Sequence, residues 1–229
     1  MPVRNRAQKF AFPFSKKLKG KTKKEFEIVI TRYKEPNIIW SDNYKDFRTV
    51  YNKGKDDVDY PCIKLDNYGM GFYTNVTHII NNYDNLADVT FFAQAIINDR
   101  DDMQIPDLEK FISTDKNTLI GLGRYMEFPE NFRFRNYIET IGEAYYKIFN
   151  QKFPEKPFIF GLGGWVSVSK EIIRNCPLSV WKKMQNYSTT DYPDASKDNS
   201  FPGWVGQYRR SMYLERLFLH AMLKKYTKI

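Results

Sequence analysis

The sequence predicts an α/β fold, a single domain with a mostly parallel central sheet flanked by helices. Short apolar, β-branched runs bounded by turn residues recur along the chain, at Phe26–Thr31, Phe47–Tyr51, Ala87–Ala93 and Phe158–Ser167. Segments whose apolar residues have helical spacing separate several of these runs. The runs are apolar at most positions, which is typical of strands buried on both faces of a parallel sheet.

Composition divides the chain into a basic leader and a neutral body. At 229 residues, 42% of them hydrophobic, the chain is long enough for one substantial core and short for two. The net charge of +9 comes from residues 1–24, which hold nine of the 36 Lys and Arg residues and none of the 27 acids. We therefore expect a flexible basic tail over 1–24 and one domain over 25–229. A nuclear signal, or contact with phosphates or anionic lipid, is the alternative use of this tail.

Several protein classes are not favoured. No window is apolar enough for a signal peptide or a membrane-spanning helix, so we expect a soluble, cytoplasmic protein. Cys62 and Cys176 are too few for a disulfide framework, and His78 and His220 add no metal-ligand spacing. Both cysteines are expected to be reduced thiols.

Polar residues follow the first two predicted strands. The strand Phe26–Thr31 runs into a polar turn before Pro36, and Phe47–Tyr51 runs into Asn52, Lys53 and Gly54. Ligands of α/β sheets bind where parallel strands end, so these residues should share one rim of the sheet. The residues expected on this rim are Arg32, Tyr33, Glu35, Asn52 and Lys53.

The stretch Asn67–Ala95 predicts a helix, an Asn/Asp turn and a buried strand. It contains the pattern G-x-x-x-x-T-x-x-x-H-I-I-x-N-Y-D-N-L-x-D-V-T-x-F-x-Q. This pattern resembles the central motif of the family called domain of unknown function 3431, which is met in large DNA viruses, fungi and algae. That family is itself similar to the GT-A glycosyltransferases. The chain differs from it at Met70 and Gly71, where the family has Arg-Glu, and at Ala95, where it has Gly.

The resemblance implies a GT-A-like glycosyltransferase that uses a nucleotide sugar and a glycan or glycoprotein acceptor. In the family the sequence Tyr-Asn-Lys-Gly follows the second strand, as it does at Tyr51–Gly54 here, and a similar position in GT-A enzymes faces the nucleotide. Gln94, which closes the motif, joins the nucleotide-binding residues implied in this way. We expect these residues to contact the nucleotide.

An acidic loop follows the strand at Ala87–Ala93. Asp99 and Asp101 have the Asp-x-Asp spacing with which GT-A enzymes hold a divalent cation, Mn²⁺ or Mg²⁺, against the diphosphate of the donor. The alternative is a solvated turn that caps a helix starting near Pro106.

The second half of the chain predicts further helices. Leu119–Met126 is ambiguous, and Asn136–Phe149 has an amphipathic pattern. A helix from Lys170 should break at Pro177 and resume over Val180–Met184. The polar stretch Ser188–Gly206 is long enough for a lid or binding loop, and Tyr208–Tyr226 should form the closing helix.

Glu215 lies in that closing helix, in the pattern R-x-x-x-L-E-R-L-F, which resembles the last helix of several bacterial polysaccharide sugar transferases. The resemblance implies a catalytic carboxylate aimed at the acceptor hydroxyl. A structural pair with Arg216 is the alternative.

Three functions follow from these observations. The first is the glycosyltransferase, and the second is a binding or structural protein that keeps the fold without the chemistry. The third is nucleic-acid binding through the tail, which we rank last because the body is neutral.

Overall fold

A computed structural model describes residues 11–95, 108–126, 128–133, 139–155, 158–189 and 207–224. The chain falls into two compact units, each built from three separate segments. The first unit comprises Met1–Asn67, Asp84–Gly121 and Trp165–Ile172. The second comprises Tyr68–Tyr83, Leu122–Gly164 and Ile173–Ile229.

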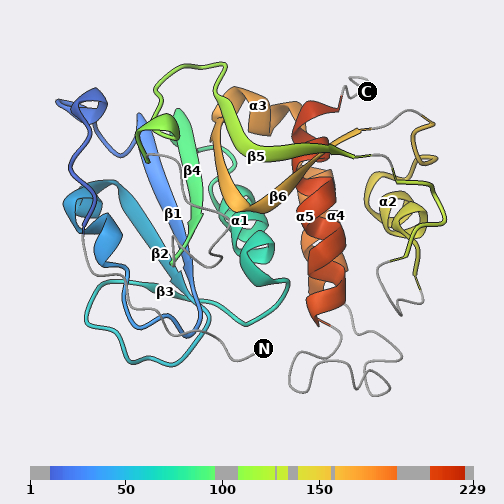
Figure 1. Ribbon diagram of the computed structural model, residues 1–229, viewed down its shortest axis with the longest axis horizontal. Coiled ribbons are helices and arrows are strands. Elements are labelled where there is room, and N and C mark those ends of the chain that lie inside the picture. Colours follow the sequence, from blue (N-terminus) through green and yellow to red (C-terminus); the bar gives the residue numbers. More distant parts are fainter. Residues whose placement is uncertain are drawn as a thin grey trace. The chain divides into compact units, whose positions relative to one another are not determined.

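The strands of the described residues form one mixed sheet in the order β3-β2-β1-β4-β6-β5 (Figure 1). Their bounds are β1 Phe26–Arg32, β2 Arg48–Asn52, β3 Ile63–Lys64, β4 Val89–Gln94, β5 Leu119–Met126 and β6 Phe158–Ser169. Strand β1 pairs in parallel with β2 and β4, and β2 pairs in parallel with β3. Strand β6 runs antiparallel to β4. The predicted α/β class and mostly parallel sheet are therefore confirmed.

The four predicted strands lie within two residues of β1, β2, β4 and β6. They were recognisable because the inner strands are buried on both faces: every residue of β1 is buried, as are the first five of β4. The ambiguous segment Leu119–Met126 is strand β5.

The core of the first unit is aromatic on one face of the sheet. Phe91 of β4 stacks on Phe111 at a ring distance of 5.1 Å and meets Trp165 of β6 at 5.5 Å. Trp40, from the 3-10 helix η2 (Ile39–Phe47), lies 6.0 Å from Trp165, and its indole Nε1 donates to the carbonyl of Ala95 at 3.0 Å. These contacts fix the carboxyl end of β4 against η2.

The described part of the leader packs on this unit. Ser15 caps the short 3-10 helix η1 (Lys16–Leu18), and Leu18 is only 1% exposed. The Phe12 N–H donates to the carbonyl of Trp40, and the Tyr44 hydroxyl donates to the carbonyl of Pro13. Residues 1–10 lie outside the described residues. A charge count misses this packing, because a buried leucine, backbone hydrogen bonds and the Lys17 amine, which donates to the carbonyls of Glu109 and Ile112, anchor a segment rich in exposed lysines.

The second unit is mainly helical. Its helices are α1 (Met70–Asn81), α2 (Ile141–Phe149), α4 (Leu178–Thr189) and α5 (Gln207–Leu223), and α3 (Lys170–Asn175) begins in the first unit. Helix α1 packs on α4 and α5, and α4 packs on α2 and α5. Phe218 of α5 is buried against α1 and α4, with ring distances of 5.6 Å to Phe72 and 5.5 Å to Trp181.

Local sequence explains where these helices begin. Thr140 and Glu143 form a reciprocal capping box at the start of α2, with hydrogen bonds of 3.1 and 2.6 Å. The break expected at Pro177 lies between α3 and α4.

In the described part of the chain, no helix has both the length and the apolar character needed to cross a membrane.

Candidate functional site

The carboxyl ends of β1, β2 and β4 bring several of the predicted residues together. Arg32 and Asn52 are register partners at the ends of β1 and β2. The Lys53 N–H donates to the carbonyl of Arg32 at 2.8 Å as part of this pair, which holds Lys53, the residue after β2, at the same edge. On the other side of β1, Gln94 of β4 pairs with Thr31. Four predicted residues from three strands thus share one edge of the sheet.

The Arg32 guanidinium is buried and bound by its own neighbourhood. Arg32 is 3% exposed, and Nε donates to the carbonyl of Glu35 at 2.9 Å. Its Nη1 donates to Asn52 Oδ1 at 3.1 Å and to the carbonyl of Lys55 at 3.0 Å. Its Nη2 forms an ion pair with Asp57 at 2.7 Å. Every nitrogen of the guanidinium therefore has a protein partner.

Asn52 completes this arrangement from β2. It is fully buried, its Nδ2 donates to the carbonyl of Lys55 at 2.8 Å, and its Oδ1 accepts from the Gly54 N–H at 3.0 Å. Arg32 and Asn52 together fold residues 53–57 into a loop over the strand ends. We call this pair and its loop the Arg32–Asn52 clamp.

Gly54 is the tightest point of the clamp. A Cβ atom at this position would lie 1.6 Å from the carbonyl oxygen of Tyr33, closer than any side chain tolerates. Only glycine therefore lets the loop after β2 pass the turn after β1.

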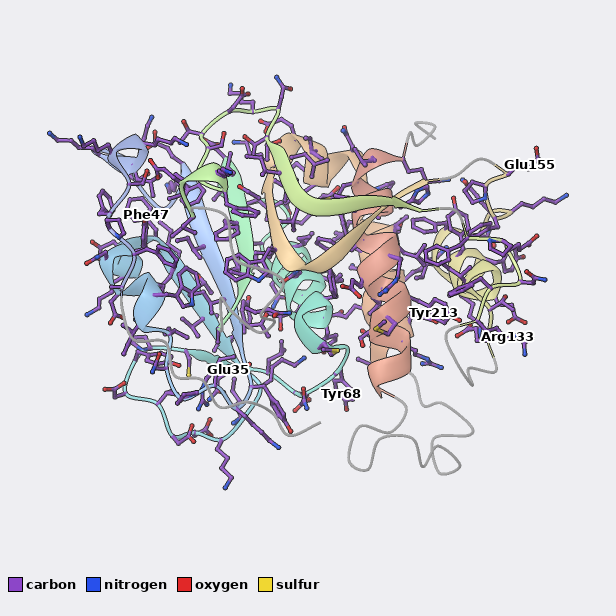
Figure 2. All side chains as sticks on the ribbon, viewed as in Figure 1. Glu35, Phe47, Tyr68, Arg133, Glu155 and Tyr213 are labelled. Atoms are coloured by element: carbon purple, nitrogen blue, oxygen red, sulfur yellow. The ribbon has the colours of Figure 1, made fainter. Side chains whose placement is uncertain are left out.

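The turn after β1 is held by Glu35, which Figure 2 labels beyond the strand. Its carboxylate accepts from the backbone N–H groups of Tyr33 at 2.5 Å and Lys34 at 3.0 Å. Tyr33 and Glu35 thus lie at the predicted rim, and the carboxylate of Glu35 shapes the turn.

Lys53 is the titratable group of this edge. Its side chain is 5% exposed, and burial lowers the pKa of its amine from 10.5 to about 7. Near neutral pH such an amine changes charge easily, so it can act as a base or can become the cation that meets an anion. No motif in the sequence signals this burial.

Three further predicted site residues are Asp99, Asp101 and Glu215. Asp99 and Asp101 lie outside the described residues. Within the described ranges, no group of three or more His, Cys, Asp and Glu side chains could hold a metal ion. Glu215, on α5 of the second unit, accepts a hydrogen bond from Nη1 of Arg216, which also donates to the carbonyl of Met212 at 3.0 Å.

A buried carboxylate in the second unit was not predicted. Glu139 is 7% exposed and accepts from the Tyr187 hydroxyl at 2.8 Å, with Lys147 Nζ at 2.5 Å from its other oxygen. The Tyr213 hydroxyl donates to the Glu139 carbonyl at 2.6 Å, and Figure 2 labels Tyr213 on α5. Burial, and then the Glu139 charge, raise the pKa of Tyr187 well above its usual value. Glu139 lies just before α2. The sequence there contains the capping pattern of the helix but no charge pattern that indicates a buried carboxylate.

A second polar cluster joins α2 to the end of α5. Lys224 Nζ donates to the Tyr145 hydroxyl at 2.7 Å, and that hydroxyl lies 3.2 Å from Nε2 of His220. Because an ammonium can only donate, the Tyr145 hydroxyl accepts a hydrogen bond from Lys224 and can donate one to His220. Burial lowers the pKa of His220 from 6.5 to about 4, which keeps the imidazole neutral.

Comparisons of the chain with protein-family models, with curated proteins and with solved structures gave no significant match.

Proposed function

We propose that the protein is a glycosyltransferase that moves a sugar from a nucleotide sugar to a hydroxyl group of a glycan or glycoprotein. The observation that carries the proposal is a buried lysine, Lys53, at the edge where β1, β2 and β4 end in parallel. Ligands of α/β sheets bind at such edges. The choice of reaction rests on the resemblance of the stretch Asn67–Ala95.

In this reaction the acceptor oxygen attacks the anomeric carbon, and the bond from that carbon to the diphosphate breaks. The acceptor proton passes to a base, and negative charge gathers on the leaving diphosphate. We propose that Lys53 meets this charge. If Asp99 and Asp101 hold Mn²⁺ or Mg²⁺, the ion would add positive charge beside the same phosphates.

The Arg32–Asn52 clamp has a supporting part in this proposal. Because protein groups bind each Arg32 nitrogen, the proposed role of Arg32 is to order the loop that carries Lys53. Tyr33 and Gln94 remain the proposed contacts for the nucleotide beside Lys53.

A binding protein without transferase chemistry is the second candidate. Met70 and Gly71 stand where the resembled family has a charged pair, and the guanidinium at the strand ends is already bound by the chain itself. Such a protein would bind nucleotide sugars and leave them intact.

One experiment separates these candidates. The protein is mixed with a panel of uridine and guanosine diphosphate sugars, with and without Mn²⁺, and both the thermal midpoint and the released nucleoside diphosphate are measured. A ligand of the native state raises the midpoint. A raised midpoint with release supports the transferase, and a raised midpoint without release for any acceptor or metal supports the binding protein. No change with any member of the panel would reject both.

A further inference from the structure

The two sides of the candidate edge differ in a way that the sequence motif does not show. Side chains alternate between the faces of a strand, and partners in register share a face. Arg32 and Asn52 therefore lie on one face, where they form the clamp. Thr31, Tyr51 and Gln94 lie on the opposite face.

Lys53 belongs with the second group. Its N–H bonds the carbonyl of Arg32 as part of the Arg32–Asn52 pair, so the backbone is still in line with β2 where Lys53 begins, and alternation then places the Lys53 side chain on the face of Tyr51. Thr31, the register partner of Tyr51, is then a diagonal neighbour of Lys53, a separation that a lysine side chain spans.

Thr31 supplies a second observation, independent of the lysine. Its side chain is 8% exposed, and within the described residues its Oγ1 has no hydrogen-bond partner. A buried hydroxyl without a partner is uncommon in folded proteins and calls for an explanation. A ligand oxygen at this edge would satisfy it.

We infer that Lys53 Nζ and Thr31 Oγ1 form an anion subsite at the carboxyl edge of β1 and β2, one that takes a phosphate group of a nucleoside diphosphate. The ligand class rests on the proposed function, whereas the subsite rests on the shared face, the burial and the hydroxyl. The Arg32–Asn52 clamp is the scaffold of the subsite, and its guanidinium lies on the other face.

Binding at this subsite should be coupled to a proton. Before a ligand binds, the Lys53 amine, with its pKa lowered to about 7 by burial, is mostly neutral above that pH, and a bound anion favours its charged form. Each binding event near pH 8 should therefore draw close to one proton from solvent.

Glu27 and Tyr51, the titratable residues that alternation places on this face of β1 and β2, do not supply that proton change. Burial, and then the Glu27 charge, raise the pKa of Tyr51 to about 12, so Tyr51 stays neutral. Glu27 lies nearer the start of β1 and already accepts from Thr49 at 2.5 Å, with Lys23 at 3.4 Å.

The test is calorimetric titration of the full chain with uridine diphosphate, and separately with inorganic pyrophosphate, at about pH 8 in two buffers of different ionisation enthalpy. We expect uptake of about one proton by the wild type. Lys53→Arg should still bind but take up none, because a guanidinium is always charged. Lys53→Met and Thr31→Val should weaken binding about tenfold or more and about fivefold, respectively.

Lys64→Arg is the matched control, since Lys64 ends β3 at the same edge but is exposed and paired with Asp56. It should bind and take up a proton as the wild type does. Each variant is first checked for the wild-type circular dichroism spectrum. If Lys53→Arg does not fold, the Lys53→Met and Thr31→Val affinities decide.

Binding with the same proton uptake in Lys53→Arg, or with unchanged affinity in Lys53→Met and Thr31→Val, would overturn the subsite even if sugar transfer is observed. Proton-coupled binding that needs Lys53, in a protein that transfers no sugar, would support the subsite and reject the transferase. If pyrophosphate binds in a way that needs Lys53 and uridine diphosphate does not bind, the subsite is supported but its ligand is not a nucleotide.

Discussion

Arg32 and Asn52 face each other across the ends of β1 and β2, joined by a hydrogen bond of 3.1 Å from Nη1 to Oδ1. Both side chains are buried, and both also donate to the carbonyl of Lys55. The loop after β2 is therefore tied to β1 by side chains as well as by its own backbone. The clamp should contribute to stability as well as to the shape of the edge.

Arg32→Gln should lower the free energy of unfolding by about 2–3 kcal/mol, because it removes charge-assisted hydrogen bonds and leaves their buried partners unsatisfied. The ion pair with Asp57 adds little to this figure, since Asp57 is 56% exposed. Urea denaturation measures the change. Lys45→Gln, an exposed lysine of η2, is the control and should stay within about 0.5 kcal/mol of the wild type. Equal stability of the two variants would contradict the role of the clamp.

Gly54→Ala should destabilise the protein by about 3 kcal/mol or more, because the new methyl group overlaps the Tyr33 carbonyl and must displace the loop. Gly121→Ala makes the contrast, since a Cβ there first meets Val166 at 3.5 Å, an ordinary contact distance. Thermal midpoints of the two variants test the difference. A Gly54→Ala protein as stable as Gly121→Ala would show that the loop can move aside freely.

Stability should depend on pH through His220. Its pKa falls from 6.5 in the unfolded chain to about 4 in the folded protein, so the folded state binds fewer protons between these values. Above about pH 6.5 the buried imidazole costs no stability, but as the pH falls toward 4 the unfolded chain binds a proton that the folded protein does not, and the free energy of unfolding falls by about 3 kcal/mol. Urea denaturation between these pH values should show a smaller loss for His220→Gln than for the wild type. Parallel curves would mean that the imidazole is not held neutral.

The two tyrosines that bond Glu139 should differ in their effect. Tyr187→Phe removes a donor from a buried carboxylate and should cost about 2 kcal/mol, whereas Tyr213→Phe removes a donor from a carbonyl and should cost about 1 kcal/mol. Repeating both substitutions in a Glu139→Gln background forms a double-mutant cycle. The cost of Tyr187→Phe should fall in that background and the cost of Tyr213→Phe should not. If the costs of the two Tyr→Phe substitutions change equally in the Glu139→Gln background, the charge of Glu139 does not explain the larger effect of Tyr187→Phe.

Glu215→Gln separates the two roles proposed for this residue. The hydrogen bond from Arg216 favours the structural pair, and both side chains are mostly buried, so we expect about 1–3 kcal/mol of lost stability and little change in sugar transfer. The unfolding free energy and the transfer rate are measured on the same preparation. A fall in rate of about a hundredfold or more with wild-type stability would instead make Glu215 the catalytic carboxylate.

Burial explains which parts of the fold could be predicted from the sequence. Strands β1 and β4 are buried on both faces, so their sequences are apolar throughout and stand out from their neighbours. Strand β5 reads LIGLGRYM, where two glycines weaken the pattern of a strand. The antiparallel direction of β6 was not predictable either, because an apolar run does not indicate whether the strand pairs in parallel or antiparallel with its neighbour.

The candidate site shows a similar division. The edge was predictable, because parallel strands end together and polar residues follow both β1 and β2. The placement of Arg32 and Lys53 on opposite faces of the sheet was not predicted. The motif groups residues by their order in the sequence, whereas the alternation of side chains along a strand assigns neighbours to opposite faces. Thr31 was not predicted, because in the sequence it is an ordinary β-branched strand residue, and only the fold shows that its hydroxyl is buried.

The division of each unit into separate segments matters for how the chain is made. The first unit gains its last segment, Trp165–Ile172, only after most of the chain has been synthesised. Until β6 pairs with it, β4 is an open edge of the sheet, with apolar residues such as Phe91 and Phe92 on that strand. Open apolar edges promote association between nascent chains. Before β6 emerges from the ribosome, β4 is thus the strand at which another chain could pair.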